Sequence, residues 1–96
     1  MQFMVISDPV PSRPSEVRGP QTKFWDWLET QKQAGIAKTC YVKTGRGAIV
    51  VFDVDSHETL HRMMTEWANC VPAAFTVYPL IDPAHQEAIA RKGSQS

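Results

Sequence analysis

The stretch TGRGAIVVFDVDSHETL, residues 44–60, contains a tight turn, an apolar strand and the start of a helix. Its two glycines around Arg46 are typical of a hairpin turn, and residues 36–43 before them are rich in β-branched and aromatic side chains. Residues 36–43 and 48–54 therefore predict the two strands of a hairpin. Asp55, with Glu58 three residues later, has the spacing of a capping box, which predicts a helix start.

The segments that follow residue 58 predict a helix and then another strand. The helix has one apolar face at helical spacing, made of Leu60, Met63, Met64, Trp67 and Cys70. Residues 69–72 end this helix, and residues 73–80 form the next strand. Asp82 and Pro83 then open a short terminal helix or arm.

The segments before the hairpin predict a strand, a loop and a helix. Residues 2–7 form a short apolar strand, and three prolines within residues 8–14 predict an ordered loop. Gly19 and Pro20 set up a helix that Gly35 ends. Its predicted buried face consists of Phe24, Trp27, Leu28, Gln31 and Ala34.

The order βαββαβ predicts a ferredoxin-like α+β fold, in which both helices cover one face of a four-stranded antiparallel sheet. Residues 1–83 form this single domain, and residues 84–96 form a C-terminal arm or short helix with a polar tail. The strands carry apolar residues at consecutive positions, whereas a sheet open to water on one side alternates. The second face therefore needs a cover, and we expect a homodimer or higher homo-oligomer.

Composition excludes several classes of protein. Lys plus Arg equals Asp plus Glu at 10 each in 96 residues, with no basic stripe for nucleic acid to bind. No apolar run approaches the roughly 18–20 residues that span a bilayer, and the N-terminus lacks the pattern of a secretion signal. Cys40 and Cys70 form no CxxC pair, so we expect free thiols and a cytoplasmic protein.

Residues 45–61 resemble the muconolactone isomerases, small proteins of the dimeric α+β barrel type. The family carries a Gly-Arg turn, a strand ending in F-D-V-[DE]-S, and a helix with a Leu-His pair. Here these are GR at 45–46, FDVDS at 52–56 and LH at 60–61. Asp8 with the proline-rich loop, and YPL at residues 78–80, extend the similarity in layout to residues 1–83.

Two segments depart from the family pattern. TCYV at residues 39–42 stands where the family has a tryptophan-bearing strand, and NCVPAA at residues 69–74 stands where it has L-P-L-F-P-Y. Both segments are expected to line the pocket between the sheet and the helices. The resemblance therefore predicts the fold more safely than the substrate.

The resemblance implies a proton shift in a small carboxylated unsaturated lactone or related cyclic acid, in aromatic compound catabolism, with neither metal nor organic cofactor. Other barrels of this type are oxygenases or cyclases of biosynthetic pathways, and fold analogy does not choose among them. A non-catalytic small-molecule-binding oligomer is the third hypothesis. The altered segments keep it open.

Such a proton shift needs a base, a donor to the enolate oxygen and a cation for the carboxylate. His61 is the first candidate base, although a half-exposed surface histidine is the commoner role. Asp53 interrupts an apolar strand and is a second candidate base if it is buried. Tyr41 is the candidate donor to the enolate.

Three further residues are candidates for binding substrate. Arg46, between two glycines, is suited to hold a carboxylate bidentately, although turn residues are usually solvated. Trp25 lies beside the buried face of its helix and is a pocket or interface residue. Cys40 is nucleophilic only if a cation lowers its pKa, and an inert mid-strand thiol is the commoner role. His57 and His61 share a helix face, but no third ligand stands at a fixed spacing, so we predict no metal site.

Overall fold

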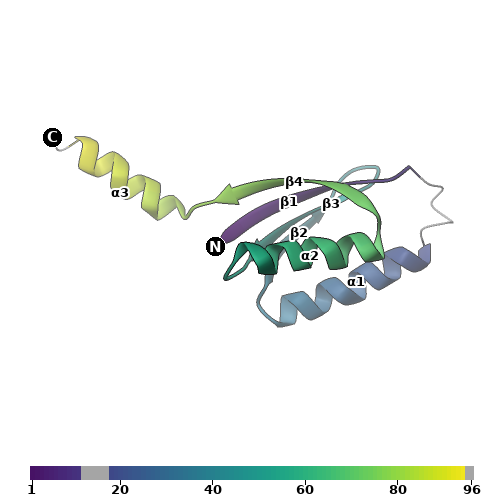
Figure 1. Cartoon of the computed structure of the whole chain (residues 1–96). Helices are drawn as coiled ribbons and strands as arrows, with labels where there is room; N and C mark the ends of the chain where they lie inside the picture. The colour runs from purple at the N-terminus through teal and green to yellow at the C-terminus, as the bar shows by residue number, and fades with distance from the viewer. Residues whose placement is uncertain (12–17, 95–96) are drawn as a thin grey trace.

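The computed structural model describes residues 1–11 and 18–94. Along these residues the chain forms four strands and three helices in the order βαββαβα (Figure 1). Their bounds are β1 Gln2–Pro9, α1 Arg18–Gln33, β2 Ala37–Val42, β3 Ala48–Asp53, α2 His57–Cys70, β4 Ala73–Leu80 and α3 Pro83–Ser94.

The four strands form one antiparallel sheet in the order β2-β3-β1-β4. The two central strands, β1 and β3, pair Phe3 with Phe52 and Val5 with Val50. Helices α1 and α2 lie on one face of this sheet (Figure 1). The ferredoxin-like α+β fold predicted from the sequence is therefore confirmed.

The hydrophobic core lies between the sheet and the two helices. On β1 and β3 the side chains alternate, and every second one faces the helices and is buried. The core residues supplied by the helices are Phe24 and Leu28 from α1 and Leu60, Met63 and Trp67 from α2. Met4, Ile6, Ile49 and Val51 alternate with the buried strand positions and therefore lie on the other face, where they are half-buried.

Several element ends differ from those predicted. Ser56, not Asp55, caps α2, because its hydroxyl accepts a hydrogen bond from the Thr59 amide at 3.1 Å. Strand β1 runs two residues further than expected, to Pro9, where it pairs with β4. Of the predicted proline-rich loop, residues 12–14 lie outside the described residues. Ala34, predicted on the buried face of α1, is exposed beyond its end.

Helix α3 projects from the end of β4, away from the sheet and the other two helices (Figure 1). The described chain is consequently elongated, with extents of 60 × 26 × 19 Å. All of α3 from residue 83 to residue 93 is exposed. In the described part of the chain, no helix combines the length and apolar character needed to cross a membrane.

Candidate functional site

The candidate site is a cavity of ≈ 160 Å³ at one end of the layer between the sheet and the helices. This end holds the β2–β3 turn, the end of β1, the start of α1 and the end of α2 (Figure 1). We call it the hollow end. Its lining residues are Ser7, Pro9, Gln21, Phe24, Trp25, Val42, Gly45, Arg46, Gly47, Ala48, Trp67 and Val71.

The floor of the cavity is formed by two small residues on neighbouring strands. Ser7 of β1 is only 2% exposed, and Ala48 of β3 lies beside it. The Ala48 amide donates to Ser7 Oγ at 2.9 Å, and this hydroxyl contacts the Ala48 carbonyl oxygen at 3.3 Å. The buried hydroxyl is thus fully engaged with backbone, which fixes the floor and leaves the space above it open.

Aromatic rings form the wall opposite the floor. Phe24 and Trp67 are buried, with ring centroids 5.2 Å apart, and Trp25 packs edge-on against Phe24 at 5.1 Å. Trp25 remains 45% exposed, which places it at the rim. Rings in this arrangement offer flat apolar surface to a planar ligand.

Arg46 supplies positive charge to the cavity. It sits in the β2–β3 turn and is half-buried, and its Nη1 donates to the Val10 carbonyl oxygen at 2.7 Å. A guanidinium has five N–H donors in a planar fork, so one such bond leaves donors for a carboxylate. Aromatic walls with one cation among the described lining residues favour a small planar acid as ligand.

A second hollow, of ≈ 310 Å³, lies at the opposite end of the domain and includes Asp53, Asp55 and Arg62. It is the larger of the two, but its charged groups have protein partners. Asp53 Oδ1 lies 3.4 Å from the Met1 ammonium group, and Arg62 Nε lies 3.7 Å from Glu66. We therefore favour the aromatic cavity as the ligand site.

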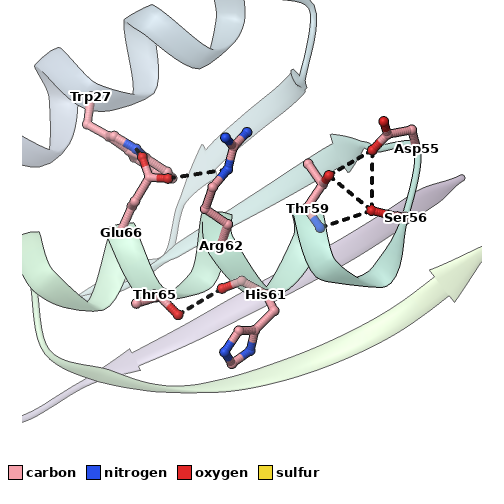
Figure 2. A network of polar contacts seen from close by, with 8 residues as sticks. All are labelled: Trp27, Asp55, Ser56, Thr59, His61, Arg62, Thr65 and Glu66. Atoms are coloured by element: carbon pink, nitrogen blue, oxygen red, sulfur yellow. Dashed lines mark hydrogen bonds and ion pairs between the residues drawn. The ribbon is translucent and has the colours of Figure 1, made fainter.

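The polar side chains at the start of α2, which border the second hollow, are likewise hydrogen-bonded to one another. Asp55 Oδ1 accepts a hydrogen bond from Thr59 Oγ1 at 2.7 Å and a longer one, 3.4 Å, from Ser56 Oγ (Figure 2). The Thr59 bond is the main reason why the pKa of the Asp55 carboxyl is lowered. These groups stabilise the first turn of the helix.

The predicted catalytic residues lie apart from one another and outside the lining of the aromatic cavity. His61 is exposed on α2 and points away from the side of the helix that carries Arg62 and faces α1 (Figure 2). Tyr41 is 68% exposed and lies on the sheet face that the helices do not cover. Asp53, at the end of β3, lines the second hollow. Their catalytic roles remain predictions.

Two of the three predicted substrate-binding residues line the aromatic cavity, and the third does not. Arg46 and Trp25 both line the cavity. Cys40, in the middle of β2, is half-buried and faces the helices beside the core. Burial raises the pKa of the Cys40 thiol, against the smaller opposing effect of Lys32, and burial raises the pKa of Cys70 as well. A raised pKa lowers the thiolate fraction, so neither thiol is activated as a nucleophile.

Sequence reasoning missed Ser7, Gln21 and Ala48 as lining residues, and it assigned Phe24 and Trp67 to the core alone. The two segments expected to line the pocket each contribute one residue, Val42 from 39–42 and Val71 from 69–74. The sequence did carry one signal for Ser7, because its hydroxyl stands where the period-two pattern of Phe3 and Val5 predicts the next helix-facing apolar side chain.

Within residues 1–11 and 18–94, no three His, Cys, Asp or Glu side chains gather as a metal site requires.

Comparison with known proteins identifies a family and a fold. A model of the family described as "Domain of unknown function (DUF3303)" matches residues 1–94, and the chain belongs to this family. No curated protein matches the chain.

Two solved structures share the fold. The 5-chloro-2-hydroxyhydroquinone dehydrochlorinase TftG from Burkholderia phenoliruptrix AC1100, in complex with 2,5-dihydroxybenzoquinone, aligns with a TM-score of 0.65 at 13% identity, over 88% of this chain and 98% of that one. The de novo designed protein Ferredog-Diesel aligns with a TM-score of 0.55 at 14% identity, over 82% and 85%. At these identities the similarity establishes the fold and not a shared activity.

Proposed function

We propose that the protein binds a small planar cyclic acid in the aromatic cavity and acts on it as a cofactor-free, muconolactone isomerase-like enzyme. The observation that carries the binding site is the position of Arg46 at a cavity walled by Phe24, Trp25 and Trp67. In this proposal Arg46 binds the carboxylate and the rings stack on the flat face of the substrate.

The proton shift rests on the resemblance of residues 45–61 to the muconolactone isomerases. The dehydrochlorinase with the same fold is in complex with 2,5-dihydroxybenzoquinone, a planar oxygenated ring, which supports a ligand of similar shape here. Oxygenase or cyclase activity on such a ring is the alternative chemistry on this fold.

A second candidate function is binding without catalysis. Among the described lining residues none is a carboxylate, an imidazole or a thiol, the groups that most often move protons. Ser7, which has a hydroxyl, is engaged with the backbone of Ala48. This composition favours a binding module over an enzyme whose base lies in the cavity wall.

The experiment that separates these functions combines turnover with binding. Isomerisation of muconolactone is followed by ultraviolet absorbance, and binding is followed by tryptophan fluorescence, because two of the three tryptophans line the cavity. Turnover above the uncatalysed rate supports the isomerase. Saturable quenching without turnover supports the binding module. If neither turnover nor quenching is observed with muconolactone or with benzoate, the proposed site is rejected.

Substitution assigns the roles of individual residues. Arg46→Gln should weaken carboxylate binding about tenfold or more, because a hydrogen-bonded charge pair is lost. His61 and Asp53 lie outside the lining of the cavity. If either is nevertheless the base, His61→Asn or Asp53→Asn should lower the rate on the order of a hundredfold. Unchanged rates in both variants would remove both residues from the mechanism, and Tyr41→Phe tests the donor in the same way.

We infer that a second copy of the chain covers the open face of the sheet, in a cytoplasmic homodimer or higher homo-oligomer. The centre of that face is apolar, with Met4, Ile6, Ile49 and Val51 contributed by β1 and β3. Because the net charge is zero, no net charge repulsion opposes association of two copies. Cys40 and Cys70 are free thiols, in keeping with a reducing compartment.

Light scattering tests this assembly against the 10.8 kDa chain mass. Val51→Asp should shift the protein to monomer, because it places a charge at the centre of the open face. Gln33→Asp introduces the same charge on the exposed side of α1 and should leave the mass unchanged. A wild-type protein that is monomeric at all concentrations would contradict the inference.

A further inference from the structure

The β2–β3 turn is tied to the end of β1 by the side chain of Lys43. Its Nζ donates to the Ser7 carbonyl oxygen at 3.0 Å and contacts the Asp8 carboxylate. The Lys43 amide in turn donates to the Gly47 carbonyl oxygen at 2.9 Å, which closes the turn. One residue therefore joins the turn to the strand that provides the cavity floor.

Gly47 allows the turn to lie close to β1. Its φ is +110°, and a Cβ atom at this position would lie only 2.5 Å from the Ser7 carbonyl oxygen. That contact is with backbone, so no side-chain rotation relieves it. The same Cβ would also lie 3.2 Å from the Lys43 side chain. The close approach and the Lys43 hydrogen bond thus converge on one carbonyl group.

Arg46 lies between these two attachments. Its own guanidinium bond, to the Val10 carbonyl oxygen at 2.7 Å, also runs from the turn to the segment after β1. We call the contacts of Lys43, Arg46 and Gly47 with residues 7–10 the turn latch. Of the residues that the turn latch joins, Ser7, Pro9, Arg46 and Gly47 line the cavity.

We propose that Lys43 and Gly47 are positioning residues for the ligand site, because the turn latch holds the Arg46 guanidinium over the cavity. This inference rests on the proposed function, since it concerns how the same cavity selects a carboxylate. It assigns Lys43 a role that acts through Arg46 and not through contact with the ligand. Lys43 is absent from the cavity lining, in agreement with such a role.

The test uses two probes of the same shape, benzoate and its neutral analogue benzamide, with binding read from tryptophan fluorescence. Lys43→Met should weaken benzoate binding about tenfold and change benzamide binding less than about twofold, since only the charged probe needs Arg46 in place. Lys43→Arg keeps a cationic donor and should restore the preference for benzoate. Lys38→Met, on the exposed part of β2, is the matched control and should match wild type.

A double-mutant cycle separates positioning from a general loss of structure. If Lys43 acts through Arg46, the Lys43→Met/Arg46→Gln double variant binds benzoate no worse than Arg46→Gln alone. Additive losses would overturn the proposal, as would equal loss of both probes in Lys43→Met. Thermal unfolding of each variant shows whether the fold is retained.

Hydrogen exchange tests the turn latch without any ligand. The buried amide of Ala48 bonds to Ser7 Oγ next to the turn latch, so its exchange should accelerate in Lys43→Met and not in Lys38→Met. Unchanged exchange in Lys43→Met would overturn the proposal. If exchange accelerates while wild type binds neither probe, the turn latch exists and the proposed ligand site is wrong.

Discussion

The two ends of the layer between sheet and helices are made by the same strands and filled in different ways. At one end Phe3 of β1 lies opposite Phe52 of β3, and both rings are buried. At the hollow end the same two strands bring Ser7 beside Ala48. Both pairs face the helices, yet the two rings fill the space between them, whereas Ser7 and Ala48 leave a cavity of ≈ 160 Å³. The second hollow, among Asp53, Asp55 and Arg62, is lined by neither ring.

The difference shows that side-chain volume, and not the course of the backbone, creates the site. Burial of a large apolar side chain contributes about 1.5–3 kcal/mol, a contribution that the hollow end gives up at two adjacent positions. In a 96-residue domain with a thin core this loss is large relative to total stability. We therefore expect the packed end to hold the fold together and the hollow end to be reserved for a ligand.

The strongest test of this contrast is a pair of identical substitutions, one at each end. Phe52→Ala should destabilise the protein by about 3–5 kcal/mol, because it opens a cavity in the packed end. Phe75→Ala on β4, opposite Ser7, removes a ring that is only partly buried and should cost about half as much or less. Urea unfolding gives both values.

The contrast fails if the two variants lose equal free energy of unfolding. Phe75 does contact Trp67, with ring centroids 5.1 Å apart, so some loss is expected at the hollow end as well. If Phe52→Ala prevents folding, Phe52→Leu provides a smaller truncation for the same comparison.

The packed end could be predicted from sequence because its signals are local. The apolar run in 48–54 after the turn predicted β3, and Leu60, Met63 and Trp67 at helical spacing predicted the buried face of α2. The cap was misplaced by one residue, since Asp55 and Ser56 are both good capping residues and only the geometry selects Ser56.

The hollow end could be predicted only in part. Trp25 stood out because it lies beside the buried face of its helix, and Arg46 stood out as a guanidinium in the turn between two glycines. Both residues line the cavity. The pairing of Ser7 with Ala48 depends on the register between strands some forty residues apart, which no local pattern specifies. His61 and Asp53 were chosen for their chemistry within the family-like motif and Tyr41 for its hydroxyl. The fold distributes the three residues over different surfaces.

A smaller effect is expected from two alanine substitutions in the turn. Gly45 and Gly47 both have positive φ, +97° and +110°, so alanine at either site is strained by about 1–3 kcal/mol. Only at Gly47 does the added Cβ also meet a neighbour, the Ser7 carbonyl oxygen. Gly47→Ala should therefore be less stable than Gly45→Ala by about 1 kcal/mol or more.

Chemical unfolding of the two variants measures this difference, with Gly45→Ala as the control for backbone strain alone. Equal losses would mean that the turn moves away from β1 freely. That result would also mean that the close contact between Gly47 and the Ser7 carbonyl group does not determine the shape of the hollow end.

The smallest change in stability, and the sharpest test of a reserved space, is expected from adding volume. Ala48→Val directs two extra carbons toward the cavity and should alter the free energy of unfolding by less than about 1 kcal/mol, within the range of strand propensity. Val50→Ile adds one carbon two residues away, where Val50 is fully buried, and should cost about 1–3 kcal/mol. Because the cavity has room, the larger addition should be the better tolerated. Benzoate binding should nevertheless fall in Ala48→Val and persist in Val50→Ile, since only the former occupies the space of the ligand. A costly Ala48→Val that still binds benzoate would show that the hollow end is neither empty nor the binding site.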